Sequence, residues 1–119
     1  MSFLNTTQLV LLERYLDGTS MRQTLVSTNV ANVDTPGYQT RDVDFRGQLQ
    51  RALSGDDNDE LVPFVMPVRG LISRPDGNNV SVDRESLLLA EIQLQYKAAI
   101  SILRAKFAQL STAIKEGQP

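Results

Sequence analysis

The chain has 119 residues, which is enough for one modest domain. It contains no histidine and no cysteine, which excludes Ser-His and Cys-His nucleophile pairs, disulfides and ordinary zinc sites. Catalysis would have to rest on carboxylate, lysine, arginine, serine or tyrosine side chains alone. The composition therefore argues against an enzyme, and we expect no catalytic residues, no cofactor and no metal.

The net charge of −2 gives the chain no general attraction for nucleic acid or acidic lipid. Residues 34–80 carry eight acids and five bases, so an acidic middle separates two nearly neutral ends. No stretch is long and apolar enough to span a bilayer, and we expect no transmembrane segment. The first residues lack the basic region of a cleavable secretory signal. We therefore expect either a cytoplasmic chain or one exported with its N-terminus uncleaved.

Residues 5–33 predict a first helix. Asn5 suits the N-cap and Gln8 the reciprocal position three residues later. Gly18 costs about 1 kcal/mol relative to alanine in a helix interior, but we favour one continuous helix over a break there. The apolar positions recur at spacings of three and four, continued through two polar residues. They are Leu9, Leu12, Leu16, Val26, Val30 and Val33, with Thr19 and Gln23 between them.

A turn and an extended arm follow this helix. Pro36 and Gly37 predict the turn, because proline holds φ near −65° and glycine accepts positive φ. Residues 39–45 alternate between polar and apolar, which predicts an extended segment. Residues 46–55 predict a short helix.

The rest of the middle segment predicts loops and an edge strand. Residues 54–60 are acidic but lack the glycine and the final glutamate of a calcium loop, which favours a solvated loop. Residues 61–68 are apolar and contain two prolines, so they can form only an edge strand or an extended arm. Arg74-Pro75-Asp76-Gly77 predicts a type I turn.

Residues 84–116 predict a second helix, roughly 50 Å long. Asp83 is the expected N-cap, Glu85 suits the positive end of the helix, and Gly117 with Pro119 ends it. Its apolar positions form a heptad seam, interrupted by Lys106 and widened by a flanking column. The seam comprises Leu89, Ile92, Tyr96, Ala99, Leu103, Leu110 and Ala113, and the column comprises Ile100, Phe107 and Ile114.

These elements predict a mainly α fold in which two long terminal helices pair as an antiparallel coiled-coil hairpin. Residues 1–38 and 81–119 would form the coiled-coil assembly domain, and residues 39–80 an irregular, partly extended middle segment. A lone two-helix hairpin is marginally stable at this size. Because the apolar stripe on the second helix is wider than one partner helix covers, we expect other copies or subunits to bury the remainder.

Several polar side chains have an ordinary interpretation. Asp42 and Asp44 could act as an acid–base pair, but surface charge is favoured on an exposed segment. Tyr38 and Phe45 could pack the arm against a helix of this subunit or of its neighbour, and both alternatives stay open. The bases of the second helix are spread around it, which favours a solvated face over nucleic-acid binding. They are Arg84, Lys97, Arg104 and Lys106.

The string Asn-Val-Ala-Asn-Val-Asp-Thr-Pro-Gly-Tyr at 29–38 resembles the Asn-x-Ala-Asn-x-x-Thr-x-Gly-Tyr motif of the bacterial flagellar rod and hook proteins. The continuation over 41–45 resembles the proximal rod branch of that family, and residues 76–80 resemble its second landmark. Ser81 departs from the family, which usually has an acid there. The resemblance assigns motif and assembly roles to Asn29, Asn32, Thr35, Pro36, Gly37 and Tyr38, with Asp42 and Phe45 in the continuation.

This resemblance implies a structural subunit of the flagellar basal-body proximal rod. Such proteins are exported unfolded by the flagellar type III apparatus, assemble helically in the periplasm around the export channel and transmit torque. Expected partners are copies of the chain, other rod proteins, and the MS-ring adaptor and export gate at the rod base. The alternative is a cytoplasmic helical-hairpin adaptor or secretion chaperone. In our physical reading, Asn29 and Asn32 satisfy free backbone groups at the helix end.

Overall fold

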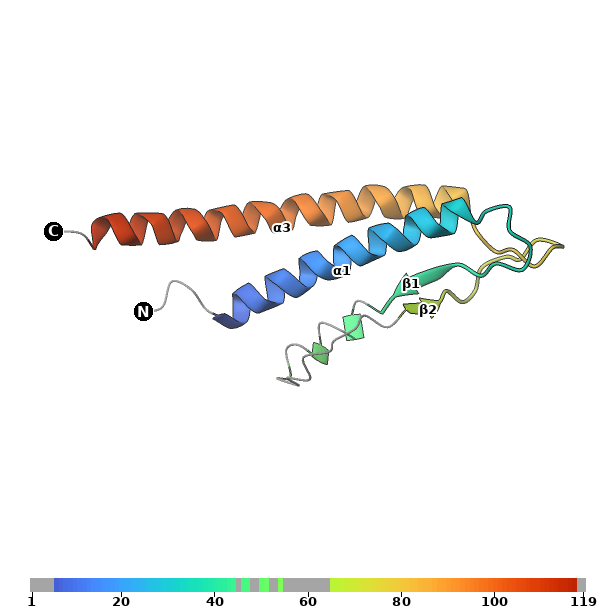
Figure 1. The fold of residues 1–119 in the computed structure, drawn as a ribbon, viewed down its shortest axis with the longest axis horizontal. Coiled ribbons are helices and arrows are strands. Elements are labelled where there is room, and N and C mark those ends of the chain that lie inside the picture. Colours follow the sequence, from blue (N-terminus) through green and yellow to red (C-terminus); the bar gives the residue numbers. More distant parts are fainter. Residues whose placement is uncertain (1–5, 45, 48–49, 52–53, 55–64, 118–119) are drawn as a thin grey trace.

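The computed structural model describes residues 6–44, 46–47, 50–51, 54 and 65–117. The chain contains two long helices, α1 (Thr6–Ala31) and α3 (Val82–Glu116). Between them in the sequence lie two short strands, β1 (Arg41–Val43) and β2 (Val65–Pro67). The helices lie side by side and antiparallel, so both chain ends lie at the same end of the molecule (Figure 1). The prediction of a mainly α antiparallel hairpin is confirmed.

Helix α1 is continuous across Gly18, which is buried. The preference for one unbroken helix is therefore confirmed, because a buried glycine in a packed helix costs less than losing the turns on either side of it. The expected N-cap at Asn5 lies outside the described residues.

Helix α3 begins at Val82, two residues earlier than an N-cap at Asp83 would allow. Ser81 has the extended backbone of an N-cap, with φ −104° and ψ 110°, and its hydroxyl accepts a hydrogen bond from the Arg84 amide at 3.3 Å. Asp83 is already helical, so the N-cap prediction for Asp83 is wrong. At the other end the Gly117 amide donates to the Ala113 carbonyl at 3.0 Å.

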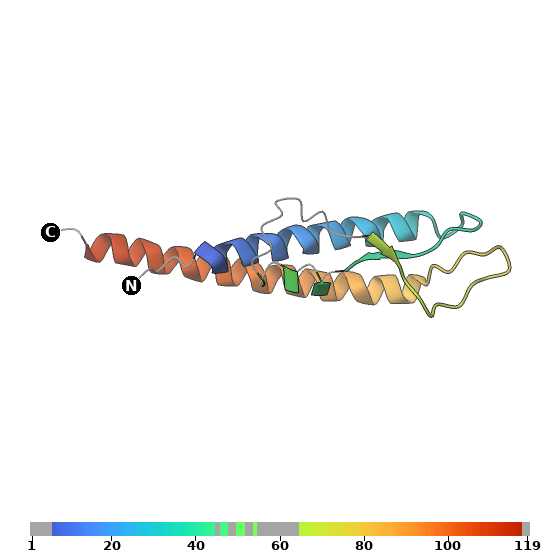
Figure 2. The same cartoon turned by 90° about the horizontal axis from the view of Figure 1, so that it is seen from below.

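Helix α3 is longer than its partner. Its 35 residues span about 52 Å, whereas the 26 residues of α1 span about 39 Å. The last turns of α3 therefore extend past the start of α1 (Figure 2). Neither of the described helices has the length and hydropathy that a membrane span requires.

Strands β1 and β2 pair antiparallel, with Arg41 opposite Pro67 and Val43 opposite Val65. Strand β1 contacts α1 and buries Val43, whereas β2 is exposed along its length. The expected edge strand is confirmed for residues 65–67. Residues 46–47 and 50–51 are helical, in agreement with the short helix predicted at 46–55. Residues 48–49, 52–53 and 55–64, which include the acidic segment, lie outside the described part of the chain.

The interior is small and unusually polar. Among the described residues, the buried apolar side chains are Val26, Val43, Val80, Ile92 and Ala99, and the buried polar ones are Thr19, Asn29, Thr40, Asn78, Asn79 and Glu85. Buried polar groups cost stability unless they are hydrogen-bonded. The folded state therefore depends on how these six side chains are partnered.

Replacing Ser81 with alanine should lower the free energy of unfolding by about 1 kcal/mol, because the first turn of α3 loses its cap. Asp83→Asn should cost less than half of this, since Asp83 contributes only through the helix dipole. Urea denaturation followed by circular dichroism measures both, with the exposed helical residue change Ser86→Ala as control. A larger loss for Asp83→Asn than for Ser81→Ala would contradict the assignment of the cap.

Candidate functional site

The two asparagine-bearing segments meet at the closed end of the hairpin. We call this region the clasp: residues 29–42, at the end of α1 and in the arm, together with residues 74–85, which lead into α3. The loops from both segments lie together beyond the helix ends (Figure 1).

Asn29 is the centre of the clasp. Its amide nitrogen donates to the Arg41 carbonyl at 2.9 Å and to Oε2 of Glu85 at 3.2 Å. Its carbonyl oxygen accepts from the Arg41 amide at 3.1 Å and from the Tyr38 hydroxyl at 2.9 Å. These four bonds use the full capacity of the side chain. The expectation that Asn29 caps its own helix is wrong, because it joins α1 to the arm and to α3.

Glu85 is fully buried in the first turn of α3. Its Oε1 accepts from the Arg84 guanidinium at 2.9 Å, while Oε2 accepts from Asn29. A buried carboxylate is tolerated only when it is paired and hydrogen-bonded. The sequence pattern assigns Glu85 a helix-dipole role and misses this tertiary one, because nothing local distinguishes a buried first-turn glutamate from a solvated one.

Asn32 bonds the last turn of α1, as expected: its amide donates to the Thr28 carbonyl at 2.8 Å. Its side-chain oxygen accepts from the Thr35 hydroxyl at 3.0 Å. The Tyr38 amide then donates to the Thr35 carbonyl at 3.2 Å, and Gly37 has φ 75°. This combination is typical of a type II turn, with Pro36 at its second position.

Asn78 and Asn79 are buried and tie the second segment to the first. The Asn78 amide donates to the carbonyls of Asn32 and Thr35, both at 2.8 Å. The Asn79 side-chain oxygen accepts from the amide and hydroxyl of Thr40 at 2.7 and 2.8 Å. The sequence marks residues 76–80 as a landmark without giving these roles; the tandem asparagines are the signal that points to them.

The two turns also touch through their backbones. The Gly37 backbone amide donates to the Asp76 carbonyl at 2.9 Å. Beside it, the side-chain Nε2 of Gln39 donates to the Gly77 carbonyl at 2.7 Å. The Gly77 amide closes the predicted turn by donating to the Arg74 carbonyl at 2.8 Å. A Cβ on Gly77 would lie 3.4 Å from the Gly37 Cα, and the φ of Gly77 is 86°. Both glycines therefore serve a left-handed backbone, and at Gly77 the close approach of Gly37 adds a steric reason.

The arm lies on its own subunit as far as it is described. Nε and Nη2 of Arg22 in α1 donate to Oδ1 and Oδ2 of Asp42 at 3.1 and 3.2 Å, and each side chain is about one-fifth exposed. Asp42 also accepts from the Val43 amide at 2.7 Å. Asn29 bonds the backbone of β1 at Arg41, and Arg22 holds the side chain of the next residue, so both fix β1 against α1. Phe45 lies outside the described residues.

The expected seam residues divide into three groups. Val26 and Ile92 are buried; Leu9, Leu12, Leu16, Leu89, Leu103 and Leu110 are half-buried; Val30, Tyr96, Phe107 and Ile114 are exposed. On α1 the buried position next to Val30 belongs to Asn29, since that side chain bonds α3. Val30 itself is 40% exposed in the single chain. On α3, Tyr96 is 44% exposed because it lies at the edge of the helix contact.

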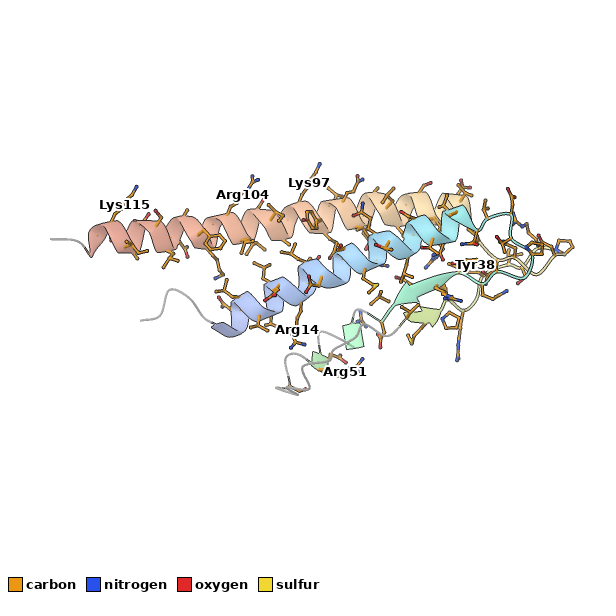
Figure 3. The ribbon with its side chains drawn as sticks, in the orientation of Figure 1. Arg14, Tyr38, Arg51, Lys97, Arg104 and Lys115 are labelled. Atoms are coloured by element: carbon orange, nitrogen blue, oxygen red, sulfur yellow. The ribbon has the colours of Figure 1, made fainter. Side chains whose placement is uncertain are left out.

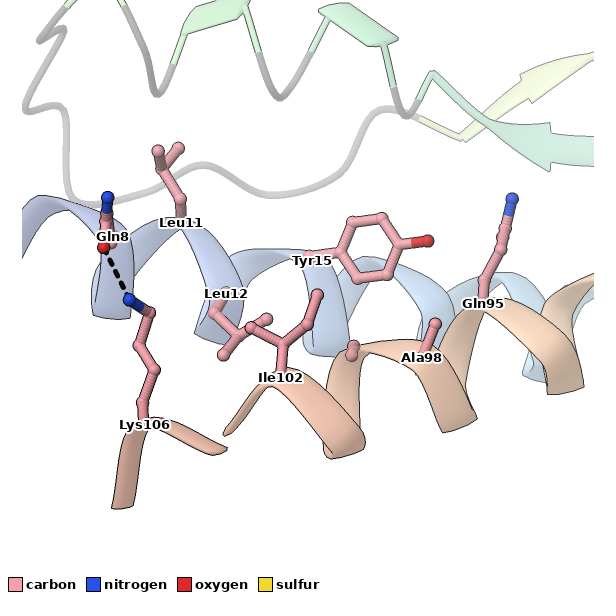
Figure 4. Close-up of a pocket in the computed structure, with 9 residues that line it drawn as sticks. Gln8, Leu11, Leu12, Tyr15, Gln95, Ala98, Ile102 and Lys106 are labelled. Atoms are coloured by element: carbon pink, nitrogen blue, oxygen red, sulfur yellow. Dashed lines mark hydrogen bonds between the residues drawn. The ribbon is translucent and has the colours of Figure 1, made fainter. Parts of the chain in front are cut away.

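Away from the clasp, an open apolar groove of about 580 Å³ lies between the first half of α1 and residues 95–106 of α3. Leu12 and Ile102 face each other across it and Tyr15 lies along it (Figure 4). At its rim the Lys106 ammonium donates to Gln8 at 2.7 Å. Burial raises the pKa of the Tyr15 hydroxyl, the charge of Glu91 raises it further, and Arg22 partly offsets this.

This arrangement is suited to holding segments together. The amides of Asn29, Asn78 and Asn79 and the carboxylate of Glu85 are all engaged by other parts of the chain. Among the described residues, no group of acids is placed to hold a metal ion.

Asn29→Asp should destabilise the protein by about 3 kcal/mol or more. The change removes both donors, leaves the Arg41 carbonyl unsatisfied and places a second carboxylate against buried Glu85. Gln23→Glu adds the same charge at an exposed position of α1 and serves as the control. Equal urea midpoints for the two variants would contradict the central role of Asn29.

Comparison with models of protein families finds no match for the chain. The chain is 34% identical over 126 residues to the flagellar basal body rod protein FlgB of Borrelia hermsii, covering 88% of this chain and 93% of that protein. It is 31% identical over 118 residues to FlgB of Escherichia coli (strain K12), covering 82% and 86%. For FlgB of Bacillus subtilis (strain 168) the identity is 30% over 119 residues, covering 90% and 92%. With this identity along most of its length, the chain belongs to the FlgB family of flagellar basal body rod proteins.

Proposed function

We propose that this chain is a non-enzymatic structural subunit of the flagellar proximal rod, which assembles helically with copies of itself and with other rod proteins and transmits torque. The observation that carries the assembly argument is the surface area. The chain exposes 8323 Å², whereas a compact monomer of 13.2 kDa exposes about 6,400 Å². A surface about a third larger than expected favours a subunit that is completed by its neighbours.

The exposed apolar side chains of α3 support the same proposal. Phe107 and Ile114 are each 56% exposed, and they continue the column that Ile100 begins. Leu87 and Leu94, one heptad apart on another face, are also exposed. Apolar columns on two faces of one helix exceed what α1 covers and would be buried by adjacent subunits.

We assign assembly to residues 1–38 and 81–119, and an irregular, partly extended middle segment with an acidic loop to residues 39–80. In this proposal the clasp fixes the direction in which the arm leaves the helices. The motif residues then act by holding that geometry, and the half-buried and exposed seam residues act by packing within and between subunits.

The proposed location is the periplasmic part of the basal body, reached by flagellar export with an uncleaved N-terminus. At the base of the rod, the MS-ring adaptor and the export gate would be the first neighbours. A tagged copy found in purified basal bodies would support this location. A stable cytoplasmic dimer that never enters basal bodies would support an adaptor or chaperone instead.

Gly37→Val should block assembly, because a β-branched residue resists the positive φ that the Thr35–Tyr38 turn requires. The measurement is incorporation of the tagged variant into basal bodies, together with swimming motility. Gly70→Val is the matched control, since Gly70 also has positive φ but lies outside the clasp. Normal motility of the Gly37 variant would contradict the role of this turn.

Phe107→Gln combined with Ile114→Gln should reduce incorporation into basal bodies while leaving the urea midpoint of the isolated protein nearly unchanged. Both side chains are more than half exposed in the monomer, so little of their burial is lost on substitution. A loss of monomer stability by more than about 1 kcal/mol, or unchanged incorporation, would argue against a buried role for this column in the rod.

A further inference from the structure

Two opposite charge blocks have no role in the clasp or the apolar columns. Residues 92–115 carry four bases and no acid: Lys97, Arg104, Lys106 and Lys115. Residues 52–68 carry four acids and no base: Asp56, Asp57, Asp59 and Glu60. The blocks are equal and opposite, with formal charges of +4 and −4.

Three of the bases form a straight row. Lys97 and Arg104 are seven residues apart, and Arg104 and Lys115 are eleven apart. The total of eighteen residues is five whole helical turns, so the side chains line up over roughly 27 Å. Figure 3 shows all three projecting from the side of α3 that faces away from α1. The expectation that the bases are spread around the helix therefore holds for Arg84 and Lys106 but not for this row.

The row has no partner within the described part of the chain. Lys106 points to Gln8 and Arg84 to Glu85, but no hydrogen bond or ion pair there engages the three row residues, which are exposed. The outward side chains between them are small and also exposed, so they leave the cations accessible. These are Ser101, Ala108 and Ser111.

The two described strands that flank the acidic segment in the sequence, β1 and β2, lie on the other side of the helix pair from the row. Strand β1 packs on α1, and neither strand contacts α3 in the described residues. The pair of strands β1 and β2 and the basic row lie on opposite sides of the helix pair (Figure 1, Figure 3). A partner for the row is therefore better supplied by another molecule than by the subunit's own middle segment.

We propose that the row of Lys97, Arg104 and Lys115 receives the acidic segment 56–60 of a neighbouring copy of this chain. This inference rests on the proposed self-assembly and names one contact within it. Its basis is charge complementarity between this unpartnered row and a segment of opposite charge in the same sequence. Exposed charge pairs of this kind set orientation and the rate of encounter more than final affinity, and they weaken as salt increases.

The first test is zero-length carbodiimide cross-linking of the full chain in basal bodies or in concentrated solution, followed by peptide mass spectrometry. The expected product joins Lys97 or Lys115 of one chain to an acid within 56–60 of another, recognised by a cross-linked dimer on a denaturing gel. Links confined to a single chain, or dimers in which these lysines join other acids or other proteins, would overturn the inference.

The second test reverses charges in pairs. Lys97→Glu with Lys115→Glu should lower self-association at low salt about tenfold, and adding Asp56→Lys with Asp59→Lys should restore it. Arg46→Glu with Arg69→Glu makes the same change in net charge at exposed positions away from the row. An equal effect of the control pair, or no rescue by the second pair, would refute the contact.

The two proposals can fail separately. If a tagged wild-type copy is absent from basal bodies, the proposed rod function fails. If the wild-type copy is present and the row variant enters equally well, the function stands and the inference about the row fails.

Discussion

The side-chain amide of Asn29 is the constraint on which the rest of the structure depends. It is buried, and its four hydrogen-bonding positions are all used: two by the backbone of Arg41, one by the Tyr38 hydroxyl and one by the Glu85 carboxylate. One hydrogen bond contributes about 1 kcal/mol net, but a buried group left unpaired costs about 1–3 kcal/mol. Loss of one of these hydrogen bonds would therefore weaken the others, and the full set is compatible with only one direction of the arm relative to the helices.

The clasp and the helices have separate physical tasks. In the clasp, hydrogen bonds from amides to backbone carbonyls specify geometry, because each bond has a preferred distance and direction. Along the helices, apolar contact is non-directional and leaves surface over, including Phe107 and Leu94. The clasp fixes the geometry of each copy, and the exposed apolar side chains along the helices remain free to contact neighbours. This division is suited to repeated assembly, because the geometry of each copy is set before its neighbours cover the remaining apolar area.

The sequence predicted the elements well and the tertiary bonds poorly. Helix periodicity, the Pro36–Gly37 turn and the proline-bearing edge strand all follow from local preferences, which the sequence states directly. The cap of α3 was misplaced because Ser81 and Asp83 are both good capping residues and only the backbone distinguishes them. Val30 was placed in the seam because periodicity counts apolar residues, whereas the buried neighbour is a polar side chain satisfied from α3.

The sequence by itself determined that the chain has two long helices, no histidine or cysteine chemistry, and a turn at Pro36–Gly37 in which the glycine has a left-handed backbone. These are consequences of composition, period and backbone sterics. Only the tertiary structure decided that the arm lies on its own α1, that Glu85 is buried, and that three bases of α3 form an unpaired outward row. Each of these depends on which distant residues are brought together, and hydrogen-bond partners and exposed faces exist only once the helices have packed.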